Sequence, residues 1–360
     1  MQKRINQMEP WIAAEEKAAI NEYLDAGGWL TEFKKTIEFE QMLADYIGCK
    51  HAIVVANGTV SLTVALMAAG IGADDEVIVP DLTMLASATS VLLTGAKPVF
   101  IDVAAHDLCL DLDQLEAAIG PRTKAVMLVS LNGRSPDMQR AVDICKRRGV
   151  VLVEDAAQSL GSRHKGKHLG TWGEIGSFSF SAPKVITTGQ GGCVTTDDDE
   201  LAARSRKIKD FGRRQAGVDF HEVVGYNFKF TDLQAVVGIA QMKKLSWRVQ
   251  RKKEMFACYR ELLAGVEQVR FLDTDLDAVS PWFIDIYVSD RDALRAHLES
   301  RDIGSRPIYP ALHSQPAFGR EGHFPVTDKA AAEGLWLPSS SFLTDDDIAR
   351  VCGEIKRFYA

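Results

Sequence analysis

The sequence predicts an α/β protein with a mostly parallel sheet in its larger first part and a smaller α+β part at its end. Three observations lead to this fold class. Short apolar runs rich in β-branched residues recur along the first two thirds of the chain, helical patterns separate these runs, and the pattern changes after about residue 245. The alternation of strands and helices indicates crossover connections, which parallel strands require.

Five apolar runs form the expected main sheet. Each run is apolar on both faces, as expected of a strand buried between helices. The expected strands are AIVVANG (52–58), EVIVP (76–80), PVFIDV (98–103), AVMLVSL (125–131) and GVVLVED (149–155). Two patterns between them predict helices, TVSLTVALMAAG (59–70) with a glycine stop and the amphipathic MQRAVDICKRRG (138–149).

The rest of the chain predicts shorter strands and longer helices. We expect strands at 176–181, 191–200 and 283–290, and helices at 201–210, 231–265, 291–300 and 344–358. The long helix at 231–265 is expected to join two domains. We therefore predict a large domain with an N-terminal helical arm at 1–245 and a small α+β domain at 246–360.

Composition limits the function classes. The chain has 42 Lys and Arg against 49 Asp and Glu, a net charge of −7, and no basic stripe with interleaved aromatic residues, so a small substrate is favoured over nucleic acid. The six cysteines form no CxxC pair, which is typical of free thiols in a reducing compartment. Without an apolar leader or a membrane-length apolar run, we expect a cytoplasmic protein with no membrane partner.

Polar residues follow two of the expected strands. Ligands bind at the carboxyl ends of strands in open parallel sheets. Asn57-Gly58-Thr59 opens a helix after the first strand, which suits a phosphate but is also consistent with an ordinary turn and N-cap. Asp155 ends the fifth strand, where a carboxylate needs a metal, an arginine or a cationic cofactor nitrogen, unless it only caps the following turn.

The stretch GSFSFSAPKVITTGQGG (176–192) adds a lysine to these strand ends. Its alternation places Ser177, Ser179 and Ser181 on one face and the phenylalanines on the other. Lys184 follows on a loop beside buried strands, where partial desolvation would lower its pKa and supply a neutral amine. A phosphate site, an acid able to pair with a ring nitrogen and an amine nucleophile together predict a pyridoxal phosphate site.

Several stretches of the sequence together resemble a known protein family. The stretches NGTVSLTVALMAAGIGADDEVIVP, GAKPVFIDV, VEDAAQSLGS, GSFSFSAPKVITTGQGGCVTT, GYNFKFTDLQA and LWLPSS, in this order, resemble the DegT/DnrJ/EryC1/StrS sugar aminotransferases over nearly the whole chain. That family has the fold type I of pyridoxal-phosphate-dependent transferases, which is aspartate aminotransferase-like. Within the family the resemblance is greatest to the 4-aminotransferases of GDP-perosamine synthase type, through GYNFKFTDLQA, YPALHSQPAF and GLWLPSS.

The resemblance implies a role for each matching position. It implies that Lys184 binds the cofactor aldehyde as a Schiff base and later shuttles a proton, and that Asp155 pairs with the ring nitrogen. The other positions that it assigns to the cofactor are Gln158 at the ring hydroxyl, Gly58, Thr59 and Ser179 at the phosphate, and Asn227 at the phosphate of the neighbouring subunit. A homodimer with shared active sites follows from the last of these roles.

Some positions depart from the family pattern. Met84 replaces the usual aromatic residue over the cofactor ring, and Lys229 replaces the usual arginine after the Asn-aromatic pair. LNGRSPDM, with Asn132 and Arg134, replaces a histidine-containing segment. We expect Lys229, Asn132 and Arg134 to contact substrate, together with His313 of ALHSQPAF.

The resemblance leads to a functional hypothesis with alternatives. The expected reaction moves an amino group from L-glutamate to the ketone of a nucleotide-linked 4-keto-6-deoxy sugar, for amino-sugar and surface-polysaccharide synthesis. A 3-aminotransferase, a sugar 3-dehydratase and a non-catalytic regulatory member of the family are the alternatives. Lys184 opposes the dehydratase, since that branch has histidine there. No metal is expected: glycines around His164 and His168 predict a hairpin rather than a helical zinc pair.

Overall fold

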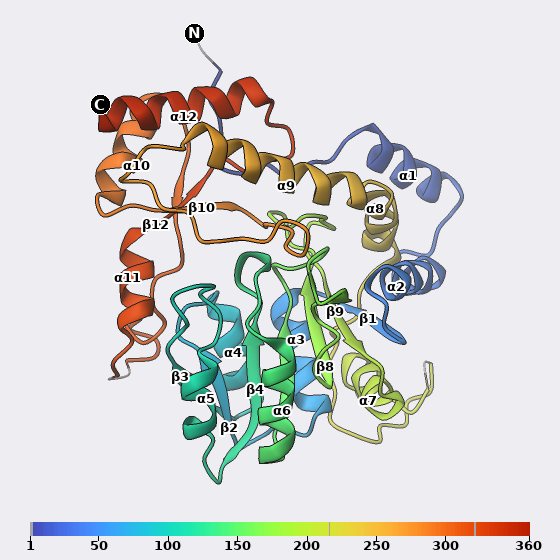
Figure 1. The fold of residues 1–360 in the computed structure, drawn as a ribbon. Helices are drawn as coiled ribbons and strands as arrows, with labels where there is room; N and C mark the ends of the chain where they lie inside the picture. The colour runs from blue at the N-terminus through green and yellow to red at the C-terminus, as the bar shows by residue number, and fades with distance from the viewer. Residues whose placement is uncertain (1–2, 216, 320–321) are drawn as a thin grey trace.

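The structure is a computed structural model that describes residues 3–215, 217–319 and 322–360. A seven-stranded sheet forms its centre, in the order β1-β9-β8-β5-β4-β2-β3 (Figure 1). Its strands are β1 His51–Val55, β2 Glu76–Pro80, β3 Lys97–Ile101, β4 Thr123–Val129, β5 Val151–Asp155, β8 Ile175–Ser179 and β9 Gly192–Thr196. All neighbouring pairs are parallel except those of β9, which runs antiparallel to β1 and β8. The mostly parallel α/β sheet is thus confirmed.

Helices cover both faces of this sheet. One face packs on α3 Gly58–Ala68, α4 Leu85–Leu93 and α7 Asp199–Lys209. The other face packs on α2 Lys34–Ile47, α5 Leu112–Ala118, α6 Met138–Arg148 and α8 Asp232–Met242. Strand residues alternate between these layers, so Ile53 of β1 faces α3 while Val54 faces α2.

The prediction of one continuous helix at 231–265 is wrong. It divides into α8 Asp232–Met242 and α9 Leu245–Leu262 (Figure 1). At the break, Lys244 lies 2.8 Å from Glu16 of α1 Ala14–Asp25, and the Gln241 amide also donates to Glu16. α8 packs on the main sheet, whereas α9 continues away from it to the second sheet.

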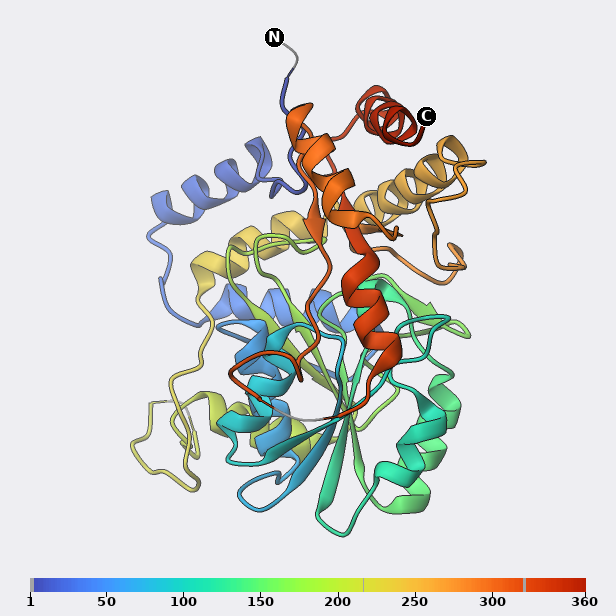
Figure 2. The same ribbon diagram turned by 90° about the vertical axis from the view of Figure 1, so that its left-hand side faces the viewer.

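The second, antiparallel sheet lies at one end of the main sheet (Figures 1 and 2). It has the order β10-β12-β11, with β10 Ile284–Tyr287, β11 Arg306–Pro307 and β12 Gly334–Leu337. Its outer face packs on α9, α10 Arg291–Ser300 and α12 Asp345–Tyr359, and α11 Pro325–Glu333 leads into β12. Its inner face presents Tyr287 and Trp336 to Leu82 and Leu131, which follow strands of the main sheet. The domain boundary at residue 245 stays a prediction.

A short hairpin follows β5. Its strands, β6 Arg163–His164 and β7 Lys167–His168, form an antiparallel pair, which confirms the hairpin predicted there. His168 is buried, and its Nε2 accepts the Gly161 N–H at 2.9 Å. None of the helices in the described ranges combines the length and apolar character that crossing a bilayer needs.

A buried ion pair joins the two sheets. Arg134 follows β4 and binds Asp285 of β10 through two contacts, Nη1 to Oδ1 at 3.2 Å and Nη2 to Oδ2 at 2.7 Å. Both side chains are at most 4% exposed. The Arg134 Nε also donates to the Asp107 carbonyl oxygen, and Tyr287 donates to Asp285. Removing one partner of such a pair leaves a buried charge without compensation.

Arg134→Met is therefore expected to lower the free energy of unfolding by roughly 3–5 kcal/mol, because Asp285 loses its cation. Urea unfolding followed by circular dichroism measures this change. Arg147→Met is the matched control, since Arg147 pairs with Glu116 at 3.2 Å with both side chains about half exposed. The control change is expected to stay below about 1 kcal/mol. Equal losses in the two variants would contradict the structural role of Arg134.

Candidate active site

The carboxyl ends of β1, β5 and β8 meet at one edge of the main sheet. β8 is parallel to β5, and β9 runs antiparallel to both β8 and β1, so all three strands point the same way. This edge therefore brings together the segment after Val55, Asp155 and the loop that carries Lys184. The second sheet lies at the same edge, because Trp282 contacts that loop.

A cradle for an anion lies at the start of α3. Asn57 caps the helix, with its side-chain oxygen accepting the Val60 N–H at 3.0 Å. The N–H groups of Gly58 and Thr59 begin the helix, where they lack intrahelical acceptors. A Cβ on Gly58 would lie 2.8 Å from the Ser179 Cβ and 2.9 Å from its Oγ, so glycine is what lets this serine approach the helix. Helix N–H groups beside hydroxyls suit a phosphate.

Asp155 is buried at the end of β5. Its Oδ2 accepts a hydrogen bond from the Ser87 hydroxyl at 2.7 Å, and its Oδ1 accepts the Ala157 N–H at 3.2 Å. Burial raises the pKa of Asp155, whereas these hydrogen bonds and the positive charge of Lys184 act in the opposite direction. An acid in this setting is stabilised as an anion by an added cation, as the ring nitrogen of a bound pyridinium would supply.

Lys184 has the lowered pKa that the sequence predicted. Burial lowers the pKa of its amine to about 8, and the negative charge of Asp155 opposes that change. The Nζ lies 4.1 Å from the centre of the Trp282 ring. The Lys184 N–H donates to the Ser181 carbonyl, which closes the turn after β8. A neutral amine is therefore accessible close to neutral pH.

Gln158 follows Asp155 at the same edge and is buried. Its Oε1 accepts the Asn132 N–H at 2.8 Å, and its Nε2 lies 3.5 Å from the Tyr309 hydroxyl. The Asn132 side chain in turn donates to the Phe283 carbonyl at 2.9 Å. Gln158 is thus held in place from both parts of the chain.

Three of the expected substrate residues have other partners in the structure. Asn132 donates to Asp285, and Arg134 is fully engaged by Asp285 and Asp107, so both side chains serve the buried link between the sheets. The residue types of Asn132 and Arg134 are compatible with binding a substrate, but both side chains are buried, which does not support a contact with substrate. His313 binds Asp81 through Nδ1 at 2.6 Å and stacks on a phenylalanine, which ties its loop to the end of β2.

Met84 begins α4 as its N-cap and is 45% exposed. Its sulfur accepts the Ala86 N–H at 3.0 Å. Ser87, one turn further along α4, is the residue that binds Asp155. The segment that we expected to cover the cofactor ring therefore begins beside Asp155, and the ring contact of Met84 stays a prediction.

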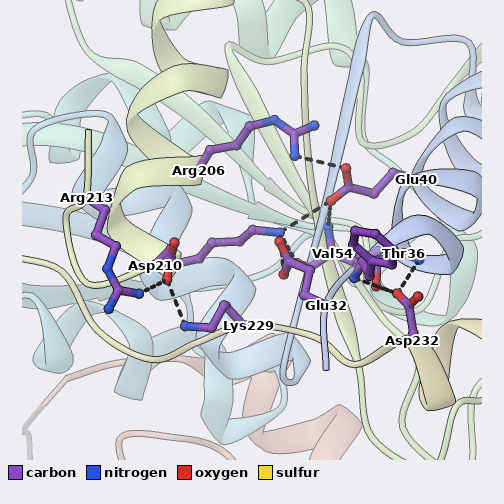
Figure 3. Close-up of polar contacts among 11 residues, drawn as sticks. Glu32, Thr36, Glu40, Val54, Arg206, Asp210, Arg213, Lys229 and Asp232 are labelled. Atoms are coloured by element: carbon purple, nitrogen blue, oxygen red, sulfur yellow. Dashed lines mark hydrogen bonds and ion pairs between the residues drawn. The ribbon is translucent and has the colours of Figure 1, made fainter. Parts of the chain in front are cut away.

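Asn227 and Lys229 lie on a segment that runs along the end of β1. The Ala56 N–H donates to the Phe228 carbonyl, which places this segment beside the start of α3. Asn227 is exposed. Lys229 binds Asp210 at 2.8 Å, and Arg213 binds the same carboxylate at 3.0 Å (Figure 3). Lys229 is thus held within its own chain, and its contact with substrate stays a prediction.

Three residues near the site were missed by sequence reasoning. Ser87 lies in the DLTMLASA segment that we considered only for its methionine. Tyr309 and Trp282 belong to the second part of the chain, and they reach the site only because its sheet packs against the main one. No local pattern marks them, since an aromatic residue in an apolar run also fits a core position.

These residues fit pyridoxal phosphate. The glycine-serine cradle at α3 suits the phosphate, the buried Asp155 suits a cationic ring nitrogen, and the amine of Lys184 suits the aldehyde. The three groups follow the carboxyl ends of β1, β5 and β8, which point the same way, with the antiparallel β9 between β1 and β8.

Comparisons with known proteins agree with this fit. Residues 10–356 match the DegT/DnrJ/EryC1/StrS aminotransferase family. The chain is 34% identical to the GDP-perosamine synthase of Escherichia coli O157:H7 over 99% of both chains, and 36% identical to that of Caulobacter vibrioides over 97% of this chain and 96% of the other. Its fold matches S. venezuelae DesV in complex with a ketimine intermediate, with a TM-score of 0.94, 33% identity and 99% of both chains covered.

The matches extend over the site as well as the fold, since residues 10–356 include the α3 cradle, Asp155 and Lys184. The two relatives are covered over 99% and 96% of their own length. The chain therefore belongs to the DegT/DnrJ/EryC1/StrS aminotransferase family and is, by that membership, a pyridoxal-phosphate-dependent sugar aminotransferase.

Proposed function

We propose that the protein moves an amino group from L-glutamate to the keto carbon of a nucleotide-linked 4-keto-6-deoxy sugar, as a perosamine synthase does. The observation that carries the proposal is the amine of Lys184, with a pKa of about 8, beside the buried Asp155 at the sheet edge. The two GDP-perosamine synthase relatives support a GDP-linked sugar.

The proposal assigns the cofactor to residues of this chain. Gly58, Thr59 and Ser179 hold the phosphate, and Asp155 faces the ring nitrogen. Gln158 faces the ring hydroxyl, and Met84 covers the ring. Pyridoxal phosphate supplies an electron sink and a carrier that keeps the amino group between the two substrates.

Two side chains of the protein handle protons in this reaction. Asp155 keeps a proton at the ring nitrogen, since a buried carboxylate is more stable beside a cation than alone. The neutral amine of Lys184 takes the proton from the amino-bearing carbon of glutamate, and it delivers one to the sugar carbon that receives the amino group. A pKa near 8 suits both steps, because the amine then gains and loses a proton close to neutral pH.

Lys184 also separates the alternatives. The dehydratase branch of the family has histidine at this position, whereas this chain has the lysine, which favours transamination. A regulatory member would not need the amine, the acid and the cradle, all of which lie here at one edge. A 3-aminotransferase and a 4-aminotransferase carry out the same reaction on sugars with the ketone at different carbons. The substrate that the protein accepts therefore decides between them.

The reaction is tested with L-glutamate and a panel of GDP- and TDP-linked 4-keto and 3-keto 6-deoxy sugars. We expect a GDP-linked 4-keto sugar to gain the mass change of ketone-to-amine exchange, measured by mass spectrometry. Lys184→Ala should give no amine product, and borohydride should fix the cofactor to the Lys184 peptide. Lys146→Ala is the matched control, because Lys146 is exposed on α6.

Each outcome has a separate meaning. An amine on a 3-keto sugar would replace the 4-aminotransferase by a 3-aminotransferase. Loss of water from the sugar would favour the dehydratase. A protein that binds no cofactor would overturn the enzymatic proposal as a whole.

We further propose that the active unit is a homodimer with shared sites. Asn227 is exposed, and the apolar residues before it are exposed as well, including Val224 at 81% and Phe220 at 59%. Other exposed apolar residues lie on the connection between α1 and α2, on α2 and on α4, namely Trp29, Leu30, Phe33, Ile37, Leu85, Leu92 and Leu93. Surfaces of this kind mark interfaces, and a second copy whose Asn227 reaches the α3 cradle of this chain is the occupant that we propose.

Complementation tests the shared site. Lys184→Ala and Asn227→Asp are each expected to be nearly inactive, the second because a carboxylate repels the phosphate. Mixed under exchanging conditions, the two should recover at most about a quarter of wild-type activity, since half of the dimers are hybrids with one intact site each. Subunit exchange is checked independently with a tagged chain. Exchange without recovery, or an active monomer in sedimentation, would contradict the shared site.

A further inference from the structure

The loop that carries Lys184 is held by a residue of the second part of the chain. The indole Nε1 of Trp282 donates to the Pro183 carbonyl at 2.8 Å. The face of the same ring lies 4.1 Å from the Lys184 Nζ. Trp282 thus contacts both the backbone before Lys184 and the end of its side chain.

Trp282 is itself fixed in position. It is 2% exposed and stacks on Phe283, with ring centres 3.9 Å apart and planes at 22°. It also packs edge-on against Trp336. The buried Lys252 of α9 donates to the Trp282 carbonyl at 2.9 Å. A ring held from several sides is a rigid reference point for a flexible lysine side chain.

The other side of the loop is held from α9. Arg248, which precedes Lys252 by one helical turn, donates from Nη1 to the Val185 carbonyl at 2.9 Å. The backbone carbonyls on both sides of Lys184, those of Pro183 and Val185, therefore accept hydrogen bonds from buried side chains outside the main sheet, Trp282 and Arg248. Asp155 of β5 provides the charge that opposes the effect of burial on the amine.

We propose that Trp282 is the positioning residue of Lys184: its N–H fixes the backbone at Pro183, and its ring face holds the free ammonium beside the site. The inference rests on the proposed function, because it presupposes that the amine of Lys184 is the reacting group. A cation over an indole face is stabilised by the ring quadrupole, and tryptophan provides the strongest such face. The ring therefore stabilises the charged form of the free amine and holds the end of the side chain in place, while burial still leaves its pKa near 8.

The test uses the cofactor-free form of the full chain and two readouts. The first is the pH dependence of Lys184 acetylation by acetic anhydride, followed by mass spectrometry of its peptide. The second is the rate at which added pyridoxal phosphate becomes fixed to that peptide by borohydride. In the wild type the first readout should have its midpoint near pH 8, the pKa to which burial lowers this amine.

Trp282→Phe removes the indole N–H and leaves a weaker ring face, whereas Trp282→Leu removes both contacts. In Trp282→Phe the attachment rate should fall by roughly two- to tenfold, the effect of one lost hydrogen bond. The acetylation midpoint should fall by a few tenths of a pH unit, because a weaker cation–π contact stabilises the ammonium less. In Trp282→Leu the attachment rate and the acetylation midpoint should both fall further than in Trp282→Phe. If Trp282→Leu does not fold, the Trp282→Phe values alone test the proposal.

Trp172→Phe is the matched control. Trp172 is a partly buried tryptophan whose ring contacts His164 and Lys167, away from Trp282 and Lys184. Wild-type values in Trp172→Phe with altered values in Trp282→Phe support the proposal. Equal changes in both variants, or wild-type values in Trp282→Phe, overturn it. Failure of the wild type to bind pyridoxal phosphate at Lys184 instead overturns the proposed function.

Discussion

A carboxylate buried at the end of β5 is the constraint on which the candidate site depends. Asp155 accepts hydrogen bonds from Ser87 and Ala157, both uncharged groups, and burial raises its pKa. Lys184 is the cation whose charge lowers that pKa again, and Asp155 in turn opposes the loss of charge on Lys184. Each group therefore stabilises the charge of the other, and a cationic ring nitrogen held by Asp155 would stabilise the acid while the lysine becomes neutral.

The second sheet completes the site instead of only covering it. Trp282 contacts the Lys184 loop, Tyr309 lies beside Gln158, and Asp285 binds Asn132. Asp285 belongs to β10, Trp282 precedes β10 and Tyr309 follows β11, so these contacts come from the second sheet and the residues that flank its strands. A change in how the two sheets pack would therefore move the contacts that hold Lys184 and Gln158, which gives the buried Arg134–Asp285 pair a role in site geometry.

The sequence predicted the main sheet and the residues at its edge, because strand ends in parallel sheets follow from local patterns. Asp155 and Lys184 lie where those patterns placed them, although their roles stay predictions. Arg134 was expected near substrate from the place of its segment in the family pattern. Its partner in the structure, Asp285, lies in another part of the chain, and no spacing in the sequence indicates that pair. The break between α8 and α9 was missed for the same reason: Glu16 of the distant α1 binds there.

The central claim is that Asp155 keeps the ring nitrogen of the cofactor protonated. The most direct measurement is the ¹⁵N chemical shift of the ring nitrogen in protein loaded with ¹⁵N-labelled pyridoxal phosphate. The account predicts a protonated nitrogen in the wild type and an unprotonated one in Asp155→Asn, at the same pH. An unprotonated nitrogen in the wild type, or the same shift in both proteins, would contradict it.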